Sequence, residues 1–192
     1  MPILLRPILL HPWEACPVDT QPVEAQPVDA RPPDTGDLAA FMAVFVRYYA
    51  EEFAIDLPPS EISYIRSEVE KGIREGYLHL LLATDREDGS IRGFILYQID
   101  TPASDWCLRP GSGFIRELYV MPAERRHGLG SRLVAAAEHE LRQRAAAAIY
   151  LTTDQAAAFW CARGYRDSGL ICRRNDGRIF EKDLPAPDGP RP

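Results

Sequence analysis

The sequence predicts an α/β fold in which helices cover both faces of a mixed, twisted β-sheet. Apolar runs of strand length alternate with amphipathic helical repeats, which gives the element order β-α-α-β-β-β-α-β-α-β-β. A glycine-bearing turn joins the apolar run 114–120 to a helical repeat that begins near Gly128, and parallel strands need such a crossover. The turn Asn175-Asp176-Gly177 indicates a hairpin, whose two strands are antiparallel.

Two amphipathic helices are predicted in the first half of the chain. Apolar residues recur at helical spacing over 38–49. The start of this helix offers three polar residues as caps: Asp34, Thr35 and Asp37. Ser60 can cap a second helix, which has its apolar positions over 62–73 and ends at Gly76.

The remaining elements follow from apolar runs that are bounded by turn residues. Strands are expected over 77–84, 91–99, 114–120, 148–152, 165–172 and 178–183. The helix from Gly128 is expected to reach about Arg144. A further helix is expected over 155–163, where Gly164 ends it.

A proline repeat lies near the start of the chain. Residues 16–33 contain the pentapeptides Pro-Val-Asp-Thr-Gln, Pro-Val-Glu-Ala-Gln and Pro-Val-Asp-Ala-Arg. Proline at every fifth position cannot build a helix, so residues 1–26 are predicted to form a low-complexity appendage that is extended or disordered. One domain is expected over 27–184, and a polar, proline-rich tail over 185–192.

Composition excludes several classes of protein. The formal net charge of −6 argues against a nucleic-acid binder that works by electrostatic attraction. No apolar run approaches the length of about 18 residues that a membrane span needs, so no membrane association is predicted. The apolar start of the chain is broken by Pro2, Arg6 and Pro7, and no signal peptide is expected.

The cysteines indicate neither a disulfide framework nor a metal site. Four cysteines are scattered along the chain without a C-x-x-C pair: Cys16, Cys107, Cys161 and Cys172. The four histidines do not cluster with them at metal-ligand spacing. These residues are interpreted as reduced thiols of a cytoplasmic protein that holds no metal.

The segment 125–131 reads Arg-Arg-His-Gly-Leu-Gly-Ser and is the most informative part of the chain. It follows a predicted strand and opens a predicted helix. Two glycines allow a ligand to approach the backbone closely, and the first helical turn offers unpaired N–H groups together with a partial positive charge. The segment therefore predicts a seat for a pyrophosphate.

The glycine spacing separates the candidate families. A dinucleotide-binding G-x-G-x-x-G motif would need glycine where Leu133 stands, and a P-loop would need lysine after Gly130. The pattern that remains is R-x-x-G-x-G, preceded by Val120-Met121-Pro122. It resembles the acetyl-CoA signature of the GCN5-related N-acetyltransferases, the GNAT superfamily.

A second motif strengthens the resemblance. Residues 156–165, Ala-Ala-Ala-Phe-Trp-Cys-Ala-Arg-Gly-Tyr, resemble the later helix of the family, at the family's usual separation from the first motif. The resemblance covers roughly residues 28–184. It implies the GNAT element order, a first strand over 28–31, and acetyl-CoA as co-substrate.

The resemblance also implies which residues bind the cofactor. Backbone amides around the glycine loop would hold the pyrophosphate of coenzyme A. A splay beside strand 114–120 would free main-chain groups of Leu118 and Val120 for the pantetheine arm, and the Val120 N–H would polarise the thioester carbonyl. The expected cofactor-binding residues are Leu118, Tyr119, Val120, Arg125, Arg126, His127, Gly128, Leu129, Gly130 and Ser131.

Glu117 is the candidate general base. Strand alternation places Glu117 and Tyr119 on the face opposite Leu118 and Val120. A carboxylate that is partly desolvated beside a cleft has a raised pKa, which suits proton transfer at neutral pH. The structural alternative is a glutamate paired with Arg116 or another arginine. Tyr119 could line the substrate pocket or simply pack.

Two positions depart from the family pattern. Trp160 stands where the family commonly has a tyrosine that protonates the thiolate, and an indole N–H is not a useful acid. Thr153 stands where many relatives have an asparagine that contacts the cofactor. Because the thiol of coenzyme A titrates near the value of a cysteine, about 8.5, water could supply the proton to its thiolate.

The first two helices and the last hairpin are the expected source of acceptor specificity in this family. The candidate residues are Tyr48, Tyr49, Glu51, Glu52, Asp56, Tyr64 and the turn Arg173–Gly177. Acidic and aromatic side chains suit a cationic amine. The acceptor could be a small molecule or a protein amine, and the exposed edge of the hairpin would permit a homodimer.

Three functions compete at this stage. The leading hypothesis is an acetyl-CoA-dependent N-acetyltransferase that works by direct transfer in a ternary complex. The second is a non-catalytic module that binds or senses acyl-CoA, which the departures at Trp160 and Thr153 favour. The third is an interaction protein whose proline repeat recruits a partner.

Overall fold

The computed structural model describes residues 29–33 and 36–185. The predicted appendage 1–26 and two of the three predicted caps of the first helix, Asp34 and Thr35, lie outside these residues. The predicted tail 185–192 also lies outside them, except for its first residue.

Within the described residues, seven strands form one sheet in the order β1-β2-β3-β4-β5-β7-β6. The strands are β1 (Asp29–Arg31), β2 (Leu78–Thr84), β3 (Ile91–Ile99), β4 (Gly113–Val120), β5 (Ala148–Thr153), β6 (Arg166–Ile171) and β7 (Arg178–Asp183). β4 and β5 are parallel, and the other neighbours are antiparallel. The prediction of a mixed sheet is confirmed.

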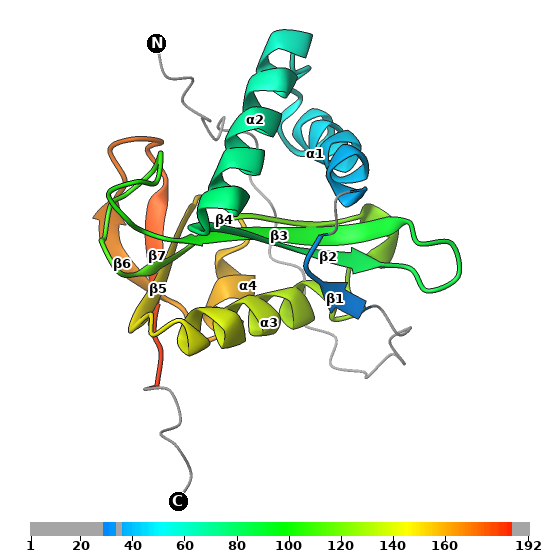
Figure 1. Ribbon diagram of the computed structural model, residues 1–192. Helices are drawn as coiled ribbons and strands as arrows, with labels where there is room; N and C mark the ends of the chain where they lie inside the picture. Colours follow the sequence, from blue (N-terminus) through cyan, green and yellow to red (C-terminus); the bar gives the residue numbers. More distant parts are fainter. Residues whose placement is uncertain (1–28, 34–35, 186–192) are drawn as a thin grey trace, which may run out of the picture.

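Helices cover both faces of the sheet, as predicted. They are α1 (Asp37–Phe53), α2 (Pro59–Glu75), α3 (Leu129–Gln143), α4 (Ala157–Ala162) and the short 3₁₀ helix η1 (Pro122–Glu124). Figure 1 shows α1 and α2 on one face of the sheet and α3 and α4 on the other. α3 is the crossover between the parallel strands β4 and β5.

Two predicted helix caps are wrong. Asp37 is the first residue of α1, after Gly36, and its carboxylate pairs with Arg31 instead of capping the helix. α2 begins after Pro58, so Ser60 lies inside its first turn. Pro59, the first residue of α2, suits this start because its missing N–H is one that the helix could not pair.

The predicted end of the second helix at Gly76 is confirmed. Gly76 ends α2 in the left-handed conformation, with φ of 79°. The predicted helix 155–163 is shorter than expected, since α4 begins only at Ala157. The N–H of Gln155 donates to the hydroxyl of Thr153 (3.0 Å), and this local turn takes the place of the first helical turn.

Each face of the sheet has its own apolar core. The core under α3 and α4 includes Leu81, Ile95, Tyr97, Ile115, Leu133, Leu141 and Trp160. The core under α1 and α2 includes Phe41, Phe45, Tyr48, Leu82, Phe94 and Tyr119. β4 lies in the middle of the sheet and contributes side chains to both cores.

β4 carries two irregularities that shape the centre of the molecule. Opposite β3, Leu96 pairs with Glu117 and Tyr97 with Ile115, so Arg116 is an extra residue in a β-bulge. On its other edge, β4 pairs with β5 only over Gly113–Ile115. Beyond Ile115 the two parallel strands no longer pair, and the edge of β4 that faces β5 is free of ladder hydrogen bonds.

A buried carboxylate anchors the loop before β4. Asp100 is 1% exposed. It accepts the backbone N–H groups of Leu108 and Arg109 (both 2.8 Å), the hydroxyl of Tyr150 (2.7 Å) and the amide of Gln98 (2.8 Å). Two of these donors belong to the loop 101–112 and the other two to strands of the sheet, so Asp100 ties the loop to the sheet.

Replacing Asp100 by alanine should lower the free energy of unfolding by about 3 kcal/mol, because it leaves several buried donors without an acceptor. Urea unfolding of the variant and the wild type measures the difference. The control is Asp88→Ala, which removes an exposed turn carboxylate and should cost less than about 1 kcal/mol. Equal losses in the two variants would contradict the anchoring role of Asp100.

Candidate active site

The bulge in β4 brings two charged side chains to one face of the sheet. Ile115 and Leu118 pack on the α3 side. Without the bulge, Arg116 would face the same side as Leu118. The extra residue breaks the alternation, so Arg116 and Glu117 both line a pocket under α1 and α2. The predicted separation of Glu117 and Tyr119 from Leu118 and Val120 is confirmed.

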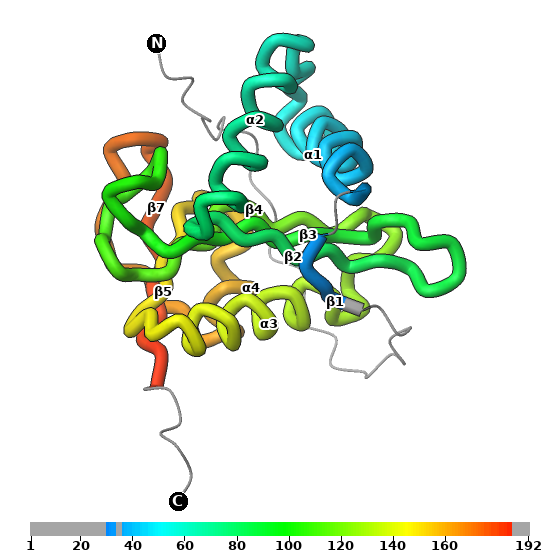
Figure 2. The backbone as a smooth tube through the Cα atoms, viewed as in Figure 1, coloured from blue at the N-terminus to red at the C-terminus, as the bar shows by residue number. Residues whose placement is uncertain are grey.

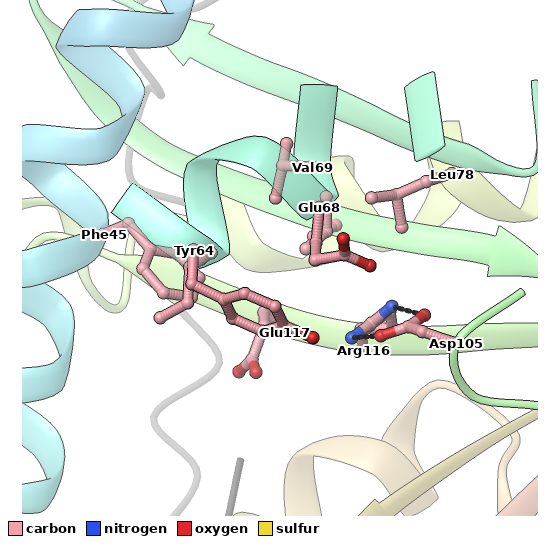
Figure 3. Close-up of a pocket in the computed structure, with 10 residues that line it drawn as sticks. Phe45, Tyr64, Glu68, Val69, Leu78, Asp105, Arg116 and Glu117 are labelled. Carbon is pink, nitrogen blue, oxygen red and sulfur yellow. Dashed lines mark hydrogen bonds and ion pairs between the residues drawn. The ribbon is translucent and has the colours of Figure 1, made fainter. Parts of the chain in front are cut away.

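The pocket has an empty volume of about 580 Å³, including its open mouth. It is lined by Phe45 of α1, by Tyr64, Ile65, Glu68 and Val69 of α2, by Leu78, Leu96 and Asp105, and by Arg116 and Glu117 of β4. Figure 3 shows the carboxylates of Glu68, Asp105 and Glu117 around an otherwise largely apolar space. The pocket therefore combines an apolar wall with negative charge.

Glu117 accepts a hydrogen bond from the hydroxyl of Tyr48 on α1 (2.7 Å). Burial of the carboxylate away from water raises the pKa of Glu117 to about 7. Tyr48, Arg116 and Tyr49 lower this pKa, but by less. A carboxylate with this pKa can take up a proton at neutral pH and release it again.

The alternative of a purely structural glutamate paired with Arg116 does not describe this site. The Arg116 guanidinium makes two hydrogen bonds to Asp105 (2.7 and 3.1 Å) and one to the side-chain oxygen of Gln98 (3.0 Å). Among the described residues, no ion pair joins Glu117 to an arginine. Asp105 thus pairs with the Arg116 guanidinium, whose positive charge would otherwise neutralise the Glu117 carboxylate.

The acidic residues predicted to select the acceptor have other partners. Glu51 accepts hydrogen bonds from Tyr119 (2.6 Å) and Arg47 (2.5 Å), and Glu52 pairs with Arg125. Asp56 is exposed and does not line the pocket. Tyr64 is the predicted acceptor residue that does line it.

Sequence reasoning missed Glu68 and Asp105. Glu68 follows Tyr64 at spacing i+4 on α2, so the helical repeat could have placed both on one face. Asp105 lies in an irregular loop, for which spacing gives no signal. Arg174 of the predicted turn Arg173–Gly177 contacts this loop, with its guanidinium 4.8 Å from the ring centre of Trp106. Figure 2 shows the two loops side by side.

The backbone of β4 offers free groups where the strands splay. The N–H of Met121 donates to the carbonyl of Arg92 on β3 (2.9 Å). Because successive residues of a strand direct their backbone groups to opposite edges, those of Val120 and Leu118 face β5, where pairing has ended. Val120 accepts a hydrogen bond from Arg125 at its carbonyl (2.9 Å). Its N–H points into the splay.

The glycine loop after β4 has the geometry of an anion seat. Arg126 and Gly128 both adopt left-handed backbone, with φ of 70° and 77°. A non-glycine residue in this region costs about 1 kcal/mol or more, and such strain gathers at functional sites. Gly128 precedes α3, and no side chain of the described part of the chain caps the first turn of this helix. Its N–H groups are therefore available to a ligand.

The remaining residues of the loop differ in what they can offer. The side chain of Leu129 is buried in the core, so only its backbone can bind a ligand. His127 is exposed and Ser131 is partly exposed at the start of α3. A Cβ atom on Gly130 would lie 3.5 Å from Phe159, an ordinary contact. Packing alone therefore does not demand glycine there.

Arg125 orders the loop from within the protein. Besides the Val120 carbonyl, it contacts the carboxylate of Glu52 on α1 and lies 5.9 Å from the ring centre of Tyr119. These contacts tie the end of α1 to the glycine loop.

The two departures from the family pattern have structural roles. Trp160 is buried between Phe159 and Tyr165, with ring centres 5.1 and 5.2 Å away. Thr153 donates to the carbonyl of Gln155 (2.9 Å) and so closes the turn before α4.

The two central parallel strands, β4 and β5, splay apart beside the uncapped start of α3. This is the arrangement that the resemblance of the two motifs to the GNAT acetyltransferases implies. A model of the acetyltransferase (GNAT) family matches residues 38–165. The chain belongs to this family and is an acyltransferase.

Solved structures share this fold. The chain is similar to PaiA N-acetyltransferase from Thermoplasma acidophilum in complex with coenzyme A, at 16% identity and a TM-score of 0.62 over 83% of this chain and 100% of that one. It is also similar to ribosomal-protein-alanine N-acetyltransferase from Brucella melitensis, at 20% identity and a TM-score of 0.61 over 81% and 99% of the two chains. No curated protein sequence matches the chain.

A GNAT family N-acetyltransferase from Escherichia coli in complex with CoA matches with 18% identity and a TM-score of 0.59, over 86% of this chain and 85% of that one.

In the part of the chain that the structure describes, no helix is long and apolar enough to cross a membrane. The same residues contain no cluster of three or more metal-ligating side chains.

Proposed function

We propose that the protein transfers the acetyl group of acetyl-CoA to a primary amine by direct transfer in a ternary complex. The observation that carries this proposal is Glu117, a carboxylate with a pKa of about 7 that lies in a pocket beside the splay of β4. A base at this place can deprotonate an amine next to a thioester held along the strand.

The cofactor would occupy the splay and the glycine loop. The free N–H and C=O groups of Leu118 and the free N–H of Val120 suit the amide-rich pantetheine arm, and the uncapped start of α3 suits a pyrophosphate. Two structural relatives, from Thermoplasma acidophilum and Escherichia coli, are complexes with coenzyme A, which supports this placement. We assign acetyl as the acyl group by membership of the acetyltransferase family.

Proton transfers follow from the positions of these groups. Glu117 takes a proton from the substrate ammonium, directly or through water. The neutral nitrogen attacks the thioester carbonyl, whose developing negative charge the Val120 N–H stabilises. The C–N bond forms and the C–S bond breaks. The attached nitrogen gives up its second proton, which passes through water to the leaving thiolate, since Trp160 is buried and has no acidic proton, and Glu117 returns its own proton to solvent.

The acceptor is a cationic amine, of a small molecule or of a protein. The carboxylates of Glu68 and Glu117 attract an ammonium group, whereas that of Asp105 is paired with Arg116, and the apolar wall accommodates the carbon chain of the amine. Tyr64 is 44% exposed at the mouth and offers its ring to the same cation. A cytoplasmic location agrees with the free thiols of Cys107, Cys161 and Cys172.

A homodimer through the edge of the sheet is a further part of the proposal. β6 is an edge strand, and Leu170 and Ile171 on it are each 56% exposed. An apolar edge of this kind favours pairing with a second copy. Sedimentation at several concentrations tests it, and a monomer throughout would contradict it.

The test of the function is release of free thiol from acetyl-CoA in the presence of a panel of amines: diamines, amino-acid amides, aminoglycosides and short peptides. An amine that accelerates thiol release, with acetylated product identified by mass, supports an enzyme. Binding of acetyl-CoA without turnover of any amine favours the alternative, an acyl-CoA-binding module. Absence of binding would favour the interaction protein that the proline repeat suggests.

A further inference from the structure

Tyr48 is fixed in place beneath Glu117. It is 7% exposed on α1, and its hydroxyl lies 2.7 Å from Oε2 of Glu117. The ring is held by aromatic neighbours on three elements: Phe45, Tyr49, Phe53, Phe94 and Tyr119. A ring packed on this many sides cannot swing its hydroxyl away without disrupting the core.

This hydrogen bond limits the directions that the Glu117 carboxylate can take. A glutamate side chain has several rotatable bonds, and on a strand beside an open pocket it would sample several orientations. Fixing one oxygen on α1 selects the orientation in which the carboxylate faces the pocket. Tyr48 and Glu117 are 69 residues apart in sequence, so the folded packing of α1 on the sheet creates the contact.

We propose that Tyr48 is the positioning residue of Glu117, holding one carboxylate oxygen so that the group faces the acceptor amine; this inference rests on the proposed role of Glu117 as base. Tyr48 does not touch the reacting atoms and acts through Glu117. Helix α1 thereby becomes part of the machinery that removes the proton.

The charges around Glu117 determine what loss of this hydrogen bond does. Tyr48 and Tyr49 face it from α1, Arg116 from β4, Glu68 and Tyr64 from α2, and Asp105 from the loop before β4. The hydroxyl of Tyr48 stabilises the charged carboxylate and so holds its pKa below the value that burial alone would give. Removing the hydroxyl must therefore raise the pKa of Glu117.

Tyr48→Phe keeps the ring contacts and removes only the hydroxyl. In protein labelled with ¹³C at glutamate carboxyls, the Glu117 resonance is the one that disappears in Glu117→Gln. Its titration midpoint should move upward by about one pH unit from the wild-type value in Tyr48→Phe. Tyr49→Phe, a second variant, should move it upward by less, because Tyr49 has the smaller effect on this pKa.

Tyr97→Phe is the matched control. Tyr97 is also a buried tyrosine that donates to a glutamate, Glu140 on α3 (2.6 Å), but it lies on the other face of the sheet. The Glu117 midpoint in this variant should coincide with the wild type. A midpoint in Tyr48→Phe that also coincides with the wild type overturns the inference.

Kinetics separates this inference from the proposed function. With an amine found in the screen, the pH limb of kcat/KM should move by the same amount as the resonance, and kcat should fall at its plateau with KM little changed. If Glu117→Gln keeps full activity, the proposed base is wrong. If Glu117→Gln is inactive but Tyr48→Phe matches the wild type at every pH, only the positioning role is wrong.

Discussion

Replacing Glu117 by glutamine should lower kcat for amine acetylation about 100-fold or more, while the affinity for acetyl-CoA stays unchanged. Glutamine is close to the same size and can still accept the Tyr48 hydrogen bond, so the pocket should keep its shape. It cannot take up a proton. The expected loss therefore reports proton transfer alone, since the proposed cofactor seat, in the splay and the glycine loop, does not include the side chain of Glu117.

The pH dependence of the rate gives a second readout. In the wild type, kcat/KM should rise with pH through a limb near 7 as Glu117 becomes a carboxylate. In Glu117→Gln this limb should be absent, and only the ionisation of the amine itself should remain. Stopped assays of thiol release over this pH range measure both curves.

The same substitution should stabilise the protein above neutral pH. Burial raises the pKa of Glu117 from 4.5 to about 7, so between these values the folded protein holds a proton that the unfolded chain has lost. The free energy of unfolding therefore falls as pH rises through this window, and the cost persists above it. Glutamine removes the cost, by an amount on the order of 3 kcal/mol at pH 8 and near zero below about pH 4.5.

Glu140→Gln supplies the control for stability. Glu140 accepts a hydrogen bond from Tyr97 on the opposite face, so this variant changes a comparable pair away from the pocket. Glu140 does not line the pocket, so a gain in stability seen only in Glu117→Gln belongs to the pocket carboxylate. If Glu117→Gln gained no stability as pH rises from about 5 to 8, Glu117 would not be the desolvated carboxylate described above.

Local sequence was enough to predict the glycine loop and the order of elements. The left-handed backbone at Gly128 and Gly76 favours glycine, and glycine in a turn between periodic runs is visible in the sequence. The alternation that separates Glu117 from Leu118 follows from the period of a strand. These features depend on neighbours in the chain.

The bulge at Arg116 depends on pairing with a strand far away in the sequence, and so it could not be predicted. One extra residue in β4 has no signature of its own, yet it moves Arg116 from the face of Leu118 to the face of Glu117. The partner of Arg116, Asp105, comes from an irregular loop. Sequence therefore indicated Glu117 as the candidate base but not the charges that surround it.

The acidic residues of α1 show a related limit. Glu51 and Glu52 lie at the end of a helix, where sequence cannot distinguish a free carboxylate from a paired one. In the structure Glu51 binds Tyr119 and Arg47, and Glu52 binds Arg125. They join the acceptor side of the molecule to the glycine loop, so substitutions there should affect the placement of both substrates.

Replacing Gly128 by glutamate should weaken acetyl-CoA binding at least about 100-fold in a protein that still folds. The new side chain places an anion at the start of α3, where the pyrophosphate is proposed to bind. Space and charge permit folding: among the described residues, no atom lies within 4 Å of a Cβ at Gly128, and a helix start favours a negative side chain. The strain of a left-handed residue costs about 1 kcal/mol.

Gly111→Glu separates loss of the seat from the cost of strain. Gly111 has φ of 82°, close to the 77° of Gly128, and a Cβ there also meets nothing within 4 Å. It precedes β4, however, whereas Gly128 follows it, so the length of an eight-residue strand separates the two positions. Calorimetric titration with acetyl-CoA should give wild-type affinity for Gly111→Glu. If Gly128→Glu bound acetyl-CoA as tightly as the wild type, the glycine loop would be excluded as the pyrophosphate seat, because a pyrophosphate cannot share that position with a glutamate without loss of affinity.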